Sequence, residues 1–215
     1  MVFEKLANAF RLLALRSSGA TVETGARLGR RVRCGGPVTI GADAIIGDDV
    51  ALNGEVKIGR GAHIEKHVTL HGNVVIGEGS VIGAFSILST LPKGQLAIGR
   101  DVYVNAFSVI GAAERVEIAD HCIFAAYVQI TDATHQIEDV SVLTKHAPIR
   151  SDPVHIGENV WLGSGAMVTM GVSIGQGAVI GAKALVTRDV PAMSVAYGVP
   201  ARVVRSRTTG EGVAT

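Results

Sequence analysis

The side chains best suited to acid–base chemistry lie in one segment, residues 131–154, which reads TDATHQIEDVSVLTKHAPIRSDPV. This segment holds two of the seven histidines, His135 and His146. Imidazole is neutral near pH 7 and can accept a proton from a hydroxyl group, so either histidine could act as a general base. Both cysteines, Cys34 and Cys122, lie elsewhere in the chain, which argues against a thiol nucleophile in this segment.

The elements that must position this segment follow a period of six residues. Aliphatic or small apolar residues, here called anchors, recur every six positions from Val22 to Leu88 without a break. The series resumes at Ile98 after four extra residues, at Ile118 after two more, and at Ile156 after the long segment. The anchors are Val22, Leu28, Cys34, Ile40, Ile46, Leu52, Ile58, Ile64, Leu70, Ile76, Ile82, Leu88, Ile98, Val104, Ile110, Ile118, Phe124, Ile130, Ile156, Leu162, Val168, Ile174, Ile180 and Val186.

A second small or β-branched residue stands four positions after most anchors, as at Ala26 and Val38. Two inward positions in every six predict short strands that each bend by a third of a revolution, so that three strands close one coil; periods of 3.6 or 2 do not fit. Gly41, Gly59 and Gly77 recur at the length of one coil, and we expect them to stack where the backbone needs glycine's dihedral freedom. The anchors therefore predict an all-β chain, a parallel β-helix of about eight coils and roughly 38 Å in length.

The composition agrees with a packed repeat protein. Hydrophobic residues make up 47% and charged residues 18%, which is enough for a buried core, and 27 glycines suit many tight turns. The formal net charge of +1, without a basic stripe, argues against nucleic acid as the main partner. Two cysteines form no disulfide framework and lack the paired spacing of a structural zinc site, so we expect no metal and a reducing cytoplasm.

The two ends of the chain are expected to differ from the repeat. An apolar helical face predicts a short helix within residues 1–19 that caps the open end of the β-helix, with contact to a membrane surface as the alternative. That face consists of Phe3, Leu6, Phe10 and Leu13. Charged residues interrupt this stretch too often for a signal sequence or a membrane span. We expect the β-helix domain over residues 20–205 and a flexible polar tail over 206–215.

From about Ile98 to Arg205 the chain resembles the hexapeptide-repeat acetyltransferases, most specifically in IGENVWLGSGAMVTMGVSIGQGAVIGAKALVTRDVPAMSVAYGVPARVVR. This family includes galactoside and maltose O-acetyltransferases and enzymes that modify polysaccharides or lipopolysaccharides. The resemblance implies a left-handed β-helix, an exception to the usual right-handed crossover. It also implies acetyl-CoA as donor substrate, no permanently bound cofactor, and a homotrimer whose protruding catalytic loop, residues 131–154, lies at a subunit interface.

The resemblance also implies roles for particular residues. A histidine in a loop ahead of an Ile-Gly-x-x-x-Trp segment is the family's catalytic base, and His135 in ITDATHQI matches it, with His146 in reserve. Asn105 in VYVNAFSVI matches a family asparagine whose amide would orient the acceptor or stabilise developing negative charge, although Asn also suits a plain turn. The residues implied along the acetyl-CoA groove are Trp161, Ser164, Ala182, Thr187, Arg188 and Arg205. Arg188 stands where the family commonly has lysine, and a buried structural role is the alternative for Trp161.

The implied activity is transfer of an acetyl group from acetyl-CoA to a hydroxyl of a small sugar acceptor, such as a polysaccharide or lipopolysaccharide precursor, by direct attack. N-acetylation of a nucleotide-linked amino sugar and acetylation of an antibiotic are the alternatives within the same chemistry.

Two more distant alternatives are a γ-type carbonic anhydrase, which uses the same prism with zinc-bound histidines, and a non-catalytic scaffold. His63, His67 and His71 fall at different phases of the repeat, so we expect them to point in different directions as solvent-facing turn residues. That arrangement disfavours a shared zinc ion.

Overall fold

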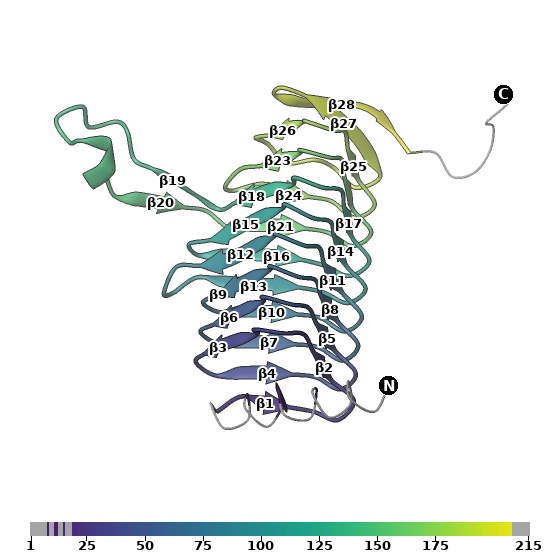
Figure 1. The fold of residues 1–215 in the computed structure, drawn as a ribbon. Coiled ribbons are helices and arrows are strands. Elements are labelled where there is room, and N and C mark those ends of the chain that lie inside the picture. The colour runs from purple at the N-terminus through teal and green to yellow at the C-terminus, as the bar shows by residue number, and fades with distance from the viewer. Residues whose placement is uncertain (1–7, 9–10, 13–14, 16–18, 208–215) are drawn as a thin grey trace, which may run out of the picture.

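The computed structural model shows a three-sided prism built from stacked parallel coils (Figure 1). The structure describes all residues except 1–7, 9–10, 13–14, 16–18 and 208–215. Each coil contributes one short strand to each of three sheets, here called A, B and C. The period of six therefore produces the predicted all-β solenoid.

Sheet A comprises β1 (Thr21–Val22), β4 (Val38–Ile40), β7 (Val56–Ile58), β10 (Val74–Ile76), β13 (Gln95–Ile98), β16 (Arg115–Ile118), β21 (Val154–Ile156) and β24 (Ser173–Ile174). Sheet B comprises β2 (Arg27–Leu28), β5 (Ile45–Ile46), β8 (His63–Ile64), β11 (Val81–Ile82), β14 (Tyr103–Val104), β17 (Ile123–Phe124), β22 (Trp161–Leu162), β25 (Val179–Ile180), β27 (Ser194–Gly198) and β28 (Ala201–Ser206). Sheet C comprises β3 (Arg33–Gly35), β6 (Ala51–Asn53), β9 (Thr69–His71), β12 (Ile87–Thr90), β15 (Val109–Ala112), β18 (Gln129–Thr131), β23 (Met167–Val168) and β26 (Leu185–Val186).

The predicted number of about eight coils is slightly low. Sheets A and C each hold eight strands among the described residues, which makes eight complete coils. Val190 then forms a parallel bridge with Ile174, and Ala196 in β27 pairs with Ile180, so the chain begins another coil. β28 turns back antiparallel on β27 and ends the stack. The count was low because stacking continues after the last regular anchor.

The anchors point inward and form the core. All of them are buried except Cys34, which is half-buried. Anchors of successive coils pair directly, as Ile40 does with Ile58. Where serine takes an inward position its hydroxyl group is satisfied by the backbone: Ser80 donates to the Gly99 carbonyl at 2.7 Å. The sequence prediction of two inward positions per repeat is confirmed.

The stacked glycines are confirmed, but the reason expected for them is wrong. Gly41, Gly59 and Gly77 do not have positive φ angles. They are instead required by close approach between coils, because a Cβ atom on Gly59 would lie 2.7 Å from the backbone nitrogen of Glu78. Neighbouring coils therefore touch backbone to backbone at these positions.

The core gives one stability prediction. Phe124 is wholly buried, so Phe124→Ala is expected to lower the free energy of unfolding by about 3–5 kcal/mol, through lost burial and the cavity that remains. Val75 is an exposed outward residue of sheet A, and Val75→Ala should change stability by less than about 1 kcal/mol. Urea unfolding followed by circular dichroism measures both; similar losses would contradict the assignment of Phe124 to the core.

Segment 131–154 forms an arm that leaves the prism between β18 of sheet C and β21 of sheet A (Figure 1). The arm is an antiparallel hairpin of β19 (Ala133–His135) and β20 (Ile149–Ser151), with the 3₁₀ helix η1 (Thr144–His146) towards its tip. The protruding loop predicted from the sequence is therefore an ordered hairpin.

The predicted capping helix lies mostly outside the described residues, including its apolar face of Phe3, Leu6, Phe10 and Leu13. The described residues Asn8 and Arg11 are helical and bind the first coil. The Asn8 Oδ1 accepts the Leu28 backbone N–H at 2.8 Å, and Arg11 Nη1 donates to the Leu28 carbonyl at 2.9 Å. In the described part of the chain, no helix is long and apolar enough to cross a membrane. Most of the predicted tail, residues 208–215, also lies outside the described part.

Candidate functional site

His135 is presented by the arm at the end of β19, where it pairs with Ile149 of β20. Its Nδ1 lies 3.1 Å from the carbonyl oxygen of Ala147. A carbonyl oxygen can only accept, so this contact places the proton on Nδ1 and leaves the Nε2 lone pair free in the neutral ring. The side chain is exposed, and Nε2 is therefore available to take a proton from a substrate.

His146, the reserve candidate, is the last residue of η1 and is also exposed. Its backbone N–H donates to the Leu143 carbonyl at 2.7 Å, but its ring has no hydrogen-bond partner in the described structure. Because a general base must be held in one orientation, the geometry favours His135 over His146.

Asn105 follows β14 at the corner between sheets B and C and is half-buried. Its Oδ1 accepts the backbone N–H of Ala106 at 2.7 Å, as expected for a turn residue. Its Nδ2 donates to no acceptor among the described residues, so the amide remains able to donate to a ligand. The turn and ligand-binding interpretations of Asn105 are therefore compatible.

The structure does not bring His135 and Asn105 together within one chain. Asn105 lies at the corner between sheets B and C, whereas the arm leaves from the corner between sheets C and A. The full width of sheet C separates these two corners (Figure 1). A site that uses both residues must be built from two copies of the chain.

The predicted donor-binding residues also divide between these corners. Trp161 lies on sheet B, and Ser164 and Ala182 occupy equivalent turn positions of successive coils at the B–C corner. Arg205 in β28 pairs with Val195 at the same sheet. Thr187 and Arg188 instead follow β26 at the C–A corner.

Trp161 is not a buried structural residue: its exposed fraction is 52%. It stands between Ile123 and Val179, its partners in the neighbouring strands. Ser164 is fixed by its hydroxyl, which donates to the Ala126 carbonyl at 2.9 Å. An exposed indole beside small turn residues leaves room for a ligand along this corner.

Sequence reasoning missed an aromatic stack on the B–C corner. The rings of His67, Phe85, Phe107 and Tyr127 lie one above another, with centroids 4.7, 5.1 and 5.2 Å apart. All four residues have positive φ angles near 60°, a conformation that bulky side chains rarely adopt. The signal was present in the sequence, because each of these residues stands three positions after a sheet B anchor.

The stack is the centre of a larger exposed surface, here called the apolar edge. It joins the aromatic rings to outward residues of sheets B and C. Its members are Phe85, Ile87, Tyr103, Phe107, Val109, Ile123, Tyr127 and Trp161. The arm also exposes apolar side chains, here together called the arm patch: Ile137, Val140, Val142, Leu143 and Ile149. One chain thus exposes two separate hydrophobic surfaces.

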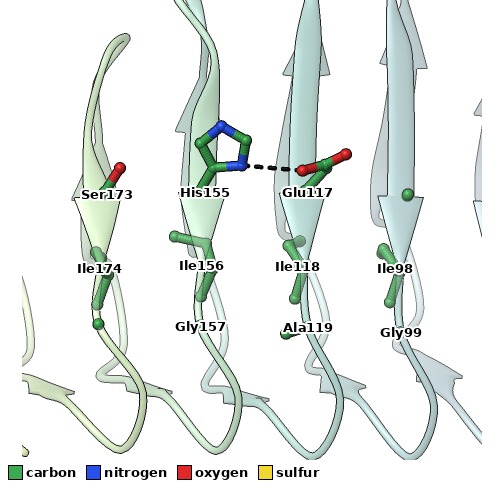
Figure 2. A pocket seen from close by; sticks show the side chains of 12 residues that line it. Ile98, Gly99, Glu117, Ile118, Ala119, His155, Ile156, Gly157, Ser173 and Ile174 are labelled. Carbon is green, nitrogen blue, oxygen red and sulfur yellow. Dashed lines mark ion pairs between the residues drawn. The ribbon is translucent and has the colours of Figure 1, made fainter. Parts of the chain in front are cut away.

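A hollow of about 490 Å³ lies on sheet A and contains none of the predicted site residues. Figure 2 shows His155 and Glu117 side by side on its floor, with Nδ1 and Oε2 joined by an ion pair of 3.0 Å, and Ser173 on the adjacent strand. The hollow lies open to solvent on the outer face of sheet A, so its size alone does not make it the chemical centre.

The remaining histidines lie at several different places on the prism. His67 lies in a turn as expected, but His63 and His71 lie in strands β8 and β9, which corrects the prediction that all three are turn residues. The three side chains lie in different places: His63 on sheet B, His67 at the B–C corner and His71 on sheet C. Among the described residues, no group of three or more His, Cys, Asp or Glu side chains could hold a metal ion.

Comparison with protein families matches residues 55–90 and 153–188 to the bacterial transferase hexapeptide family, six repeats. Such repeats indicate a left-handed β-helix, as predicted. The chain is 40% identical over 108 residues to the galactoside O-acetyltransferase of Escherichia coli and 35% identical over 115 residues to a probable acetyltransferase of Mycobacterium tuberculosis. The matches cover 50% and 54% of this chain but only 52% and 38% of those relatives. These matches confirm that about half of the chain resembles hexapeptide-repeat acetyltransferases.

Solved structures show the same fold. An N-acyltransferase from Bacillus cereus, in complex with dTDP and coenzyme A, has a TM-score of 0.62 at 21% identity and matches 70% of this chain and 84% of that one. A hexapeptide-repeat acetyltransferase from Vibrio cholerae, complexed with acetyl coenzyme A, has a TM-score of 0.55 at 24% identity, over 64% and 71% of the two chains.

Proposed function

We propose that this chain is an acetyl-CoA-dependent acetyltransferase that acts on a sugar-like acceptor. The observation that carries the proposal is the oriented imidazole of His135, which the arm holds outside an otherwise regular prism with Nε2 exposed. The chain's similarity to a galactoside O-acetyltransferase and to a probable acetyltransferase supports the same chemistry.

The reaction proceeds by direct attack. His135 Nε2 takes the proton of an acceptor hydroxyl as its oxygen attacks the thioester carbonyl carbon of acetyl-CoA. The C–S bond then breaks, and the protonated imidazole returns the proton to the departing sulfur. Neither cysteine suits an acyl-enzyme, since burial raises the pKa of the Cys34 and Cys122 thiols to about 11.

The donor lies along the B–C corner in this proposal. The second residue after the sheet B anchor is small in the three coils that contain β17, β22 and β25. These residues are Ala126, Ser164 and Ala182, and they leave space for the narrow pantetheine chain. Trp161 flanks this space, and Arg205 supplies a guanidinium that suits phosphate. Thr187 and Arg188 come from the C–A corner and reach the same donor only from a neighbouring chain.

The functional unit is a homotrimer in this proposal. The arm patch of one chain packs on the apolar edge of the next, which covers both hydrophobic surfaces and brings His135 to the neighbour's Asn105. Because the two surfaces are different and lie at different corners, the contact is head-to-tail, and a rotation of a third of a turn between neighbours closes it as a ring of three. Three equivalent sites then lie between subunits.

The acceptor is a small sugar or a nucleotide sugar, O-acetylated on a hydroxyl, and a nucleotide-linked amino sugar or an antibiotic is the second candidate. The protein works in the cytoplasm in this proposal, where acetyl-CoA is available and where both cysteines, free in the structure, remain reduced.

The proposed function is tested by following free thiol released from acetyl-CoA in the presence of sugars and amino sugars. We expect release that depends on a pyranoside acceptor such as methyl β-galactopyranoside or on an amino sugar, with a mass increase of one acetyl group on the acceptor. No binding of acetyl-CoA by calorimetry would contradict the proposal and favour a non-catalytic scaffold. Hydrolysis of acetyl-CoA without acetylation of any acceptor would contradict the proposed transfer.

A further inference from the structure

The three irregularities in the anchor series all fall at the same corner of the prism. The extra residues between Leu88 and Ile98, those between Ile110 and Ile118, and the arm all connect sheet C to sheet A, in three successive coils. The two shorter insertions stack on each other, since the Leu91 N–H donates to the Ala112 carbonyl at 2.9 Å. These two stacked insertions, here called the buttress, lie in the two coils that precede the arm.

Asp132 joins the arm to this buttress. Its side chain lies at the root of the arm and is wholly buried. Its Oδ1 accepts the backbone N–H of Ala113 at 2.6 Å, and its Oδ2 accepts those of Glu114 and Arg115 at 2.8 and 2.7 Å. The two-residue insertion thus provides three converging donors for one carboxylate.

The backbone of Asp132 also holds the returning strand of the arm. Its carbonyl oxygen accepts the N–H of Asp152 at 2.9 Å, and the Asp152 carbonyl accepts the Gly171 N–H of the following coil at 2.9 Å. Both roots of the hairpin are therefore tied to the prism. His135 is three residues beyond Asp132, on a strand paired with β20 from Ala133 onward.

The chemistry of this contact requires a carboxylate. Asp132 forms no ion pair with any described cationic side chain, so the three N–H groups must offset the cost of burying it. Asparagine has the same shape, but its amide NH₂ would face N–H donors and leave at least one of them unsatisfied. Burying a carboxylate at this position costs free energy, so we expect the residue to have a role in fixing the root of the arm.

We propose that Asp132 is a positioning residue that sets the direction and reach of the arm, and hence the place of His135. Its catalytic consequence depends on the proposed function, in which His135 must meet a substrate held by the neighbouring chain. A displacement of about 1 Å of a reacting group can cost about a hundredfold in rate, so a loosened root reduces turnover without removing any group that touches substrate.

The test compares Asp132→Asn with Asp139→Asn in the full-length protein. Asp139 is an exposed arm residue whose Oδ1 accepts the N–H and hydroxyl of Ser141, so it controls for the loss of an arm carboxylate. Hydrogen exchange should rise about tenfold or more in residues 133–151 of Asp132→Asn and remain unchanged in the prism. The kcat should fall about tenfold to a hundredfold, while the KM for acetyl-CoA changes less than about twofold. Asp139→Asn should alter none of these values.

Unchanged exchange in the arm of Asp132→Asn would overturn the proposal, and so would an equal rise throughout the prism or a normal kcat with a loosened arm. If the asparagine variant does not fold, Asp132→Ser keeps one acceptor and faces the same criteria. If the wild-type protein transfers no acetyl group to any acceptor, the proposed function has failed, whereas the exchange measurement still decides whether Asp132 fixes the arm.

Discussion

The substitution His135→Ala is expected to lower kcat for acetyl transfer by about 10²- to 10⁴-fold, the usual contribution of a general base. The structure predicts this because His135 is the arm histidine whose ring is oriented, through Nδ1 and the Ala147 carbonyl. The KM for acetyl-CoA should change little, since the imidazole acts on the acceptor proton. Steady-state kinetics with both substrates varied measures the two effects separately.

The matched control is His146→Ala, which removes an exposed imidazole from the same arm. Its kcat should stay within about twofold of wild type, because nothing described holds that ring in place. Unchanged transfer by a folded His135→Ala protein would refute the proposed mechanism. A large loss confined to His146→Ala would move the base to the reserve position.

Mixed oligomers should recover activity that the separate variants lack. In His135→Ala every site lacks the base, and in Asn105→Ala every site lacks the amide, which we expect to cost about 10²- to 10³-fold as for a donor to an oxyanion. If each site takes His135 from one chain and Asn105 from the next, random assembly of equal amounts leaves about one site in four intact. Co-expression should therefore give about a quarter of wild-type kcat in the unselected population, and about a third in trimers purified for both variants, each of which holds one intact site in three.

Co-expressed chains with different affinity tags, purified through both tags in turn, provide the mixed species. Variants mixed after separate purification serve as the control, because preformed homotrimers exchange slowly or not at all. No recovery in a verified mixed oligomer would show that both groups act within one chain. Sedimentation of the wild-type protein as a monomer would contradict the interfacial site altogether.

The sequence predicted the prism well because one physical requirement repeats along the whole chain. Every coil must bury the same inward positions, so spacing alone predicts that Ile40, Ile58 and Ile76 stack on one another. The start of an incomplete further coil at Val190 was missed, because its spacing departs from six. The role of Gly59 was misjudged because spacing reveals recurrence but not whether torsion or close approach is limiting.

The candidate site was less accessible to sequence reasoning. His135 and Asn105 could be selected by type and resemblance, and their corners could have been deduced from the phase of the preceding anchors. The contact of His135 with Ala147 depends on how a hairpin closes over twelve residues, which no short-range pattern encodes. The three donors around Asp132 come from an insertion in the preceding coil, so its importance appears only in three dimensions.

The placement of every insertion at one corner suggests how this architecture acquires new specificity. After each interruption the anchors resume the same stacking positions, as Ile98 does on Ile76 and Ile156 on Ile118. The added length therefore leaves the packing of the core unchanged. Evolution can therefore lengthen, shorten or exchange the arm without redesigning the prism. For the protein engineer, the same corner is a natural grafting point, where a foreign loop of different length should be accepted provided that its first residues preserve the Asp132 clamp.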